Sequence, residues 1–351
     1  MSKIYWISGA AAVAQRVTVQ VTAYDATTTY KLTVGGIVIS VIAGGSVNAT
    51  ATALAAAWNG STHPYCSAVT ATALTDTVTL TADAAGVPFV VTSSVSGGTG
   101  TIGSATTATA NAGPNDYSTA ANWSTGVVPA NGDYVYLTNG SDPILWGLAQ
   151  SGVAPALLQI EQSFIGQVGL YSSSFLTGVG SADTTVPEYR ATYLATAAAI
   201  VRIGENFGAP QARGAALIKL DLGSAAADVT VFATGASGDG LPPALLRVNN
   251  SGAQVRILEG TVGLWWESEA QTGQASSVEV IGTGQVFMGG GFTLASHTQT
   301  AGTGVARNAP ATTIIEPSGV LTLAGSGTIT LLENRGQLTM AGIYSVTTLR
   351  G

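Results

Sequence analysis

The segment from Ile314 to Ala341 contains one short pattern twice. The copies read EPSGVLTLA around Gly319 and ENRGQLTMA around Gly336. In each copy, apolar residues stand at the second and fourth positions after the glycine. Each position of the first copy is therefore separated from its equivalent in the second copy by the same number of residues. Looser copies surround Gly252 and Gly284. A repeat this short constrains the fold more than any other feature of the chain.

Apolar residues that alternate with polar ones indicate strands with one buried face. A unit too small to bury that face alone must stack on further copies of itself. Stacking at this repeat places Leu321 over Leu338 and Leu323 over Met340, with backbones about 4.8 Å apart. We therefore expect a mainly β chain: a right-handed parallel β-helix, or solenoid, with a small N-terminal α+β domain. An antiparallel sandwich also gives short alternating strands, but it has no need for identity at a fixed offset.

The four repeat glycines, Gly252, Gly284, Gly319 and Gly336, are predicted to form solenoid corners. A sharp corner often requires a positive φ, which glycine adopts without steric cost.

Composition limits the possible functions. Only 9% of residues are charged, 46% are hydrophobic and the net charge is −7, so there is no basic footprint for nucleic acid. The single cysteine, Cys66, excludes a disulfide framework and a multi-cysteine zinc site. His63 and His297 stand alone in the sequence and are predicted to lie in surface loops; no metal or cofactor is expected. No apolar run is long enough for a membrane span.

Residues 13–96 have a different pattern and are predicted to form the small α+β domain. Residues 30–34 and 37–42 indicate a hairpin around a Gly-Gly turn, and 47–58 a helix that covers one face of a sheet. Further strands are expected at 66–73, 77–82 and 89–92. The segments YKLTVGG, ATALAAAW and TVTLTADAAGVPFVV together resemble a module of tailed-phage virion proteins, including tail-sheath relatives. That resemblance implies a virion component and no particular chemistry.

The Gly/Thr/Ala-rich residues 97–113 are expected to be a linker, followed by a β-helix domain at 114–351. The motif NWS at 122–124, with the later Pro and GDYV, resembles the opening of phage and bacterial surface β-helix proteins. In those proteins a YWxxG segment comes just before, whereas here it lies at residues 5–9. We therefore expect residues 1–12 to join the solenoid cap across an inserted domain, with Trp6 and Trp123 as apolar plugs. Residues 189–202 fit either a short helix or two strands.

The strongest candidate site is Trp265, Trp266, Glu267 and Glu269. On a strand, Trp265 and both carboxylates share one side, with about 7 Å between the carboxylates, while Trp266 faces the other side. Paired carboxylates beside an aromatic platform are typical of glycoside hydrolysis. The alternative is that they are ordinary surface acids beside a tryptophan buried at a subunit interface. No catalytic residue is assigned, and the chain is expected not to be an enzyme.

The resemblances imply a structural protein of a phage virion, most specifically a capsid decoration or cement protein that bridges capsomers. Its expected partners are the major capsid protein and two further copies in a homotrimer, with no nucleic acid and no membrane. Its expected location is the capsid surface, after synthesis in the host cytoplasm. The alternative is a tailspike or receptor-binding protein that binds or degrades host polysaccharide. A bacterial adhesin is a third reading, and the sequence shows no secretion signal to support it.

Overall fold

The computed structural model describes residues 2–42, 44–170, 188–205, 214–236, 242–266, 273–307, 311–316 and 318–351. The chain forms two compact units. The solenoid unit comprises Met1–Ser8, Ala120–Leu170 and Thr192–Gly351, and the small unit comprises Gly9–Thr119 and Tyr171–Ala191. The small unit therefore interrupts the sequence of the solenoid unit twice.

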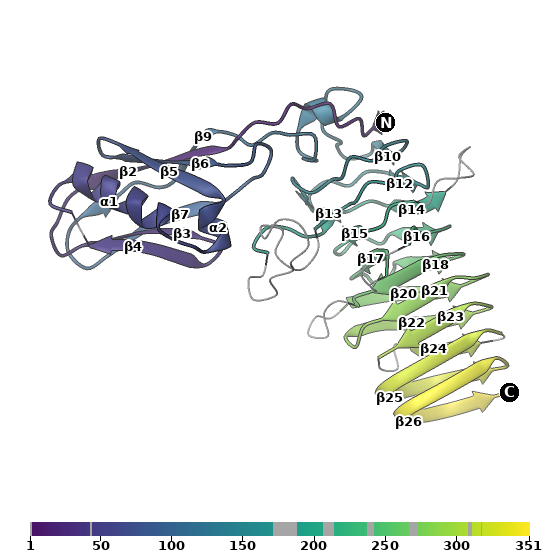
Figure 1. The fold of residues 1–351 in the computed structure, drawn as a ribbon. Helices are drawn as coiled ribbons and strands as arrows, with labels where there is room; N and C mark the ends of the chain where they lie inside the picture. Colours follow the sequence, from purple (N-terminus) through teal and green to yellow (C-terminus); the bar gives the residue numbers. More distant parts are fainter. Residues whose placement is uncertain are drawn as a thin grey trace. The chain divides into compact units, whose positions relative to one another are not determined.

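The solenoid unit contains one continuous sheet, which has 18 strands among the described residues. The ladders of this sheet are parallel throughout the described part of the unit, as is visible from the stacked arrows in Figure 1. The strands are β1 (Lys3–Tyr5), β10 (Tyr134–Leu137), β11 (Ala149–Gln150), β12 (Leu157–Glu161), β13 (Leu194–Thr196), β14 (Ile200–Glu205), β15 (Ile218–Asp221), β16 (Asp228–Val231), β17 (Ala244–Arg247), β18 (Gln254–Ile257), β19 (Thr261–Leu264), β20 (Gly273–Val280), β21 (Gln285–Met288), β22 (Phe292–Gln299), β23 (Thr303–Ala306), β24 (Ala311–Glu316), β25 (Val320–Asn334) and β26 (Gln337–Arg350).

Strands that are consecutive in the chain are mostly not the ones that share a ladder. β10 pairs with β12, β11 with β13, and this alternation continues to β23. Each coil thus contributes one strand to each of two stacks, and the long β25 and β26 take part in both. This is the architecture of a parallel β-solenoid, so the predicted fold class is confirmed and the sandwich alternative for this region is wrong. The hand of the winding stays a prediction.

A column of aliphatic side chains fills the solenoid core. It contains one residue from each successive strand of the first stack, all in register: Val135, Leu158, Val201, Val229, Val255 and Val278. Below Val278 the buried column continues through His297, Ile314 and Leu332, and the same register ends at Leu349, which is exposed on the last strand. Successive members of this lower part follow one another closely and almost evenly in the chain, whereas those above Val278 are separated by longer and unequal segments. The regular repeat therefore belongs to the last coils only.

The register predicted for those last coils is confirmed. Leu321 pairs with Leu338 and Leu323 with Met340 in the ladder between β25 and β26. Leu321 and Leu323 are completely buried. Residues 189–202, which the sequence left open, contain strand β13 and the beginning of β14.

The first coil is built from two distant parts of the chain. β1 pairs in parallel with β10, although the whole of the small unit's first segment lies between them in the sequence, and Ile4 lies beside Val135. Trp6 and Trp123 form an isolated antiparallel bridge, and their rings meet edge to face with centroids 5.1 Å apart. Both tryptophans are buried. These contacts fit the interpretation that the small unit is an insertion into the solenoid opening.

The small unit contains two antiparallel sheets and two helices among its described residues. Its elements are β2 (Arg16–Ala23), β3 (Thr29–Val34), β4 (Ile37–Ile42), α1 (Val47–Asn59), α2 (Pro64–Ser67), β5 (Val69–Leu74), β6 (Thr77–Ala82), β7 (Val91–Ser96), β8 (Thr101–Ile102) and β9 (Thr106–Thr109). One sheet has the order β5-β6-β2-β8, with β9 also on β2, and the other the order β4-β3-β7. The prediction of a single sheet is therefore wrong: apolar residues of both sheets share one core.

Helix α1 packs into this core. The Ser46 hydroxyl caps its first turn by accepting a hydrogen bond from the Ala49 amide at 3.1 Å. Trp58, fully buried, donates its indole N–H to the Val69 carbonyl at 2.8 Å, which joins the helix to β5. Cys66 lies in α2, not in the strand predicted from residue 66, and is buried.

The expected linker at 97–113 is also wrong in part. Residues 101–102 and 106–109 form strands β8 and β9, and both pair with β2. Threonine favours strands, and the open edge of β2 supplies a pairing partner that the composition of a Gly/Thr/Ala segment does not reveal.

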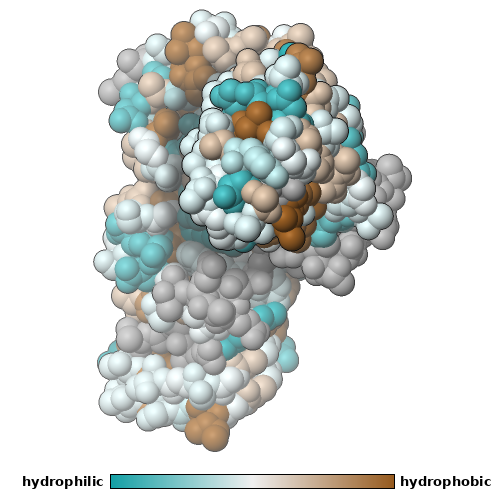
Figure 2. Space-filling model, turned by 90° about the vertical axis from the view of Figure 1, so that its left-hand side faces the viewer, coloured by the Kyte–Doolittle hydropathy of each residue, from teal (hydrophilic) through white to brown (hydrophobic). Residues whose placement is uncertain are grey.

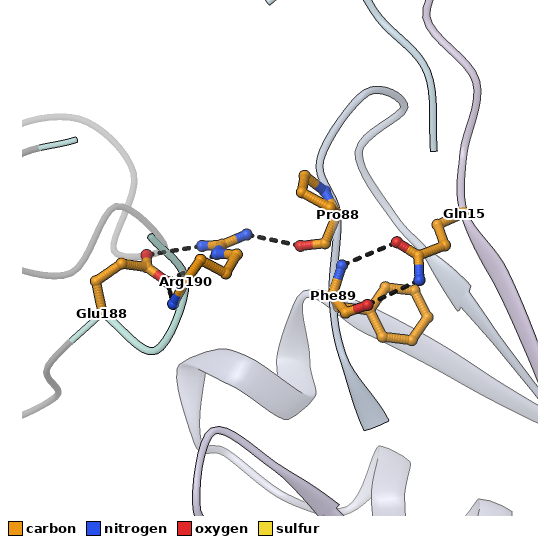
Figure 3. Close-up of polar contacts among 5 residues, drawn as sticks. All are labelled: Gln15, Pro88, Phe89, Glu188 and Arg190. Atoms are coloured by element: carbon orange, nitrogen blue, oxygen red, sulfur yellow. Dashed lines mark hydrogen bonds and ion pairs between the residues drawn. The ribbon is translucent and has the colours of Figure 1, made fainter. Parts of the chain in front are cut away.

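Residues 188–190 are attached to the small unit by polar contacts (Figure 3). Arg190 forms an ion pair with Glu188 at 2.7 Å and donates a hydrogen bond to the Pro88 carbonyl at 2.8 Å. Next to Pro88, Phe89 exchanges two hydrogen bonds through its backbone with the side chain of Gln15. Both charged side chains of the ion pair are almost completely buried, so removal of either one leaves an unpaired buried charge.

Candidate functional site

Trp265 has a strained backbone conformation. Strand β19 ends at Leu264, and Trp265 has a φ of 51°, so the predicted strand does not continue through this residue. Its indole N–H donates to the Val248 carbonyl at 2.7 Å. A Cβ at Gly273 would overlap the Trp265 indole, and one at Gly289 would overlap the Trp265 carbonyl oxygen. Glycines on both sides therefore make room for a left-handed aromatic residue, a conformation that costs about 1–3 kcal/mol.

Trp266 is half-buried and packs against the side chain of Leu245 and its neighbours. Its ring lies 5.1 Å from the Phe287 ring, and the guanidinium of Arg307 lies 3.9 Å above it. These residues come from three successive strands of the second stack or from the turns that follow them.

A second cation–π group adjoins the first. Arg247 places its guanidinium 3.8 Å from the Tyr193 ring and 5.5 Å from that of Trp265, and it also reaches Asp221 at 3.9 Å. The ammonium of Lys219, whose residue is fully buried, lies 4.5 Å over Tyr193. We call Tyr193, Arg247, Trp265, Trp266, Phe287 and Arg307 the aromatic cluster. Stacked rings and cations of this kind contribute about 0.5–2 kcal/mol per contact and tie neighbouring coils together.

Glu267 and Glu269, the predicted carboxylate pair, lie outside the described residues. The structure thus brings together the two tryptophans of the candidate site with a tyrosine, a phenylalanine and two arginines that the sequence analysis did not select. Only the register of the coils places those four near the tryptophans, since each of them belongs to a different part of the chain.

The four predicted corner glycines all lie in turns that precede strands β18, β21, β25 and β26. Of the four, only Gly319 has a positive φ, of 98°. Gly284 and Gly336 are instead tightly packed, since a Cβ on either would lie 2.9 Å from a carbonyl oxygen of the preceding coil. Gly252 has more space, its nearest neighbour being the Asn250 side-chain oxygen at 3.1 Å. The expected positive φ therefore applies to one corner of the four.

A buried polar group in the last coils was missed by the sequence analysis. His297, predicted to lie in a surface loop, is wholly buried on β22, where its Nε2 lies 3.2 Å from the Gln299 side-chain oxygen. Gln299 in turn donates to the Val320 carbonyl at 2.7 Å. Burial lowers the pKa of His297 to about 4, only partly opposed by the Gln299 contact, so the ring is neutral. His297 lies directly beside Val278 in the ladder between β20 and β22. This equivalence to a core valine was the signal that could have revealed its burial.

Glu316 lies one coil further on and is also completely buried. Neither carboxylate oxygen forms a well-aligned hydrogen bond with any of the described residues. Burial raises its pKa to about 7, an effect that the nearby Leu321 amide opposes. The neutral acid is therefore stabilised in the folded chain.

A shallow hollow lies over β14, β16 and β18, with a volume of about 280 Å³. It is lined by Ile200, Arg202, Asp228, Thr230, Phe232, Arg256 and Leu258. Arg202 is paired with Glu205 at 3.2 Å and Arg256 with Glu279 at 3.1 Å. The charges here are balanced internally and do not favour an anionic ligand.

Within the described ranges, no group of three or more His, Cys, Asp and Glu side chains is arranged to hold a metal ion. No helix in that part of the chain has both the length and the apolar character needed to cross a membrane. Neither protein-family models nor curated proteins give a match to this sequence.

Proposed function

We propose that this chain is a structural component of a phage virion, most specifically a decoration or cement protein on the capsid surface. The observation that carries the proposal is the insertion of a separately folded small unit into the first coil of a parallel solenoid, between β1 and β10. The small unit has the sequence resemblance to tailed-phage virion proteins described above. The opening of the solenoid has the resemblance to phage and bacterial surface β-helix proteins. The arrangement joins a stacked, rigid element to a module that resembles virion parts.

Such a protein would act by burying surface across neighbouring capsomers. An interface of about 1,600 Å² or more is expected for stable attachment. The outer surface suits this role, because pale, weakly polar atoms predominate on the face shown in Figure 2, in keeping with a charged content of 9%. A homotrimer remains part of the proposal, since capsid lattices provide threefold axes.

The test is co-sedimentation of the purified chain with shells assembled from the major capsid protein of the same genome. Saturable binding at a fixed ratio to capsomers is expected, with a trimeric mass for the free protein. Absence of binding to mature and to expanded shells would contradict the proposal.

A second function, binding of host polysaccharide, is favoured by the strained Trp265 and by the half-buried Trp266 beside it. Aromatic rings bind the apolar faces of sugars, although Arg307 already covers one face of Trp266. Incubation with capsular and O-antigen polysaccharides tests this alternative. Binding that is lost in Trp266→Ala, or depolymerisation lost in Glu267→Gln, would favour a tailspike over a decoration protein.

A further inference from the structure

Strand β4, residues Ile37–Ile42, is an edge strand with an unusual composition. Its sequence, IVISVI, has no charge and no proline. It pairs with β3 along its whole length without a register shift, so no bulge bends it away. Proteins usually protect such edges with lysine, proline, a bulge or a covering element, because an open apolar edge pairs with other strands.

One face of the strand packs against the core of the small unit, and the other face is exposed. Ile37, Ile39 and Val41 are only partly buried against the core of the small unit. On the other face the exposed fraction is 51% for Val38 and 70% for Ile42. Adjacent exposed apolar side chains along one short edge are typical of interaction surfaces, whereas single ones are common on any protein.

The hairpin geometry decides which backbone groups are open. Gly35 and Gly36 form the turn, with φ of 55° and 84°, and this turn closes on the Val34–Ile37 pair. In such a hairpin the closing pair is hydrogen-bonded, and bonded pairs then alternate. The amides of Val38, Ser40 and Ile42 therefore point to the free edge, where no described residue pairs with them.

We propose that β4 pairs antiparallel with β4 of a second copy of this chain, about a twofold axis through Ser40. In this register Ser40 faces its own counterpart, and Val38 faces Ile42 of the other copy. All three residues have amides that point outward, and the apolar side chains of Val38 and Ile42 are exposed. On the opposite face Ile39 meets Val41 in the same way.

Charge does not oppose this pairing. The nearest charged side chain across the strand is Lys31, which lies beside Ser40 on β3. In the paired form the two Lys31 residues are three strand spacings apart, about 14 Å, which exceeds the screening length of about 10 Å at moderate salt. The contact is independent of the proposed virion function, although in a virion it would link neighbouring copies through their small units.

The first experiment is sedimentation velocity of the full chain from micromolar to hundreds of micromolar concentration. As the concentration rises, the species present at the lowest concentration is expected to associate into one of twice its mass. Val38→Lys should raise the dissociation constant of that step at least about tenfold. Leu74→Lys is the matched control, since Leu74 is 78% exposed on β5 of the other sheet, and it should leave the step unchanged.

The second experiment tests the register by cysteine cross-linking. Ser40→Cys should form a disulfide-linked dimer under mild oxidation, because paired residues have Cα atoms about 5.5 Å apart. Val38→Cys should not, since it lies about 14 Å from its counterpart in this register. The native Cys66 is buried and does not compete. No mass doubling in the wild type, equal effects of the two lysine variants, or equal cross-linking of both cysteine variants would overturn the proposal.

Discussion

Leu321 and Leu338 occupy the same position in two consecutive coils and are directly paired in the parallel ladder between β25 and β26. The side chain of Leu321 is completely buried between its neighbours. A stacked core of this kind transmits the loss of one side chain mainly to the adjacent coils.

Leu321→Ala should therefore destabilise the C-terminal coils by about 2–5 kcal/mol, since it leaves a cavity in a closely packed column. Val320→Ala is the control, because Val320 is 36% exposed on the same strand and should cost less than about 1 kcal/mol. Hydrogen exchange by mass spectrometry, peptide by peptide, measures both. Faster exchange spread evenly over the whole solenoid would contradict the nearest-neighbour picture.

Glu316→Gln should change how stability depends on pH. The folded pKa of Glu316, about 7, is above its ordinary 4.5, so the folded chain retains a proton that the unfolded chain has released. Stability is therefore lost as the pH rises from about 4.5 to about 7, by up to about 3 kcal/mol. The glutamine variant, neutral at every pH, should lack this loss in denaturant titrations. If the free energy of unfolding depended on pH in the same way in the variant and the wild type, Glu316 would ionise in the folded state as it does in water.

His297→Leu should have the opposite effect. The folded pKa of His297, about 4, is below its ordinary 6.5, so stability is lost as the pH falls from about 6.5 to about 4. The variant should be less sensitive to acid than the wild type in the same titrations. Between these values the contributions of His297 and Glu316 oppose each other, so the wild-type profile should be flatter than either variant's. Two variants that shift the slope in the same direction would refute this compensation.

Gly319→Ala should be more costly than the same change at Gly132. Both glycines have a positive φ, but a Cβ at Gly319 would lie 3.0 Å from backbone atoms of the preceding coil and from the Gln299 amide, whereas nothing lies within 4 Å at Gly132. The backbone conformation alone costs about 1 kcal/mol, and the crowding at Gly319 adds at least a similar amount. Thermal unfolding of the two variants measures the difference. Equal shifts would show that the corner can relax around the added methyl group.

The solenoid could be predicted because the last coils have a nearly constant length. Gly319 and Gly336 reveal that length directly, and the register of Leu321 follows from it. Further upstream, insertions lengthen the coils, so residues such as Val201 and Val229 could not be aligned by counting.

The errors have a common physical cause. His297, the Thr-rich strand β9 and the residues around Trp265 all depend on partners that are distant in the chain. Local composition makes a lone histidine resemble a surface residue and a Gly/Thr segment resemble a linker. In the folded chain, pairing with other strands buries the histidine and makes part of the Gly/Thr segment a strand. The aromatic cluster is a similar case, since only the stacking of the coils brings Arg307 over Trp266.

The most direct test of the structural role is a comparison of phage particles made with and without this chain, by the temperature at which they release their DNA. If the chain holds the shell together, particles that lack it should assemble and adsorb to the host normally but release DNA at a lower temperature, and added purified protein should restore the wild-type value. Particles of unchanged heat stability that fail to adsorb would contradict the account and identify the chain as a receptor-binding protein.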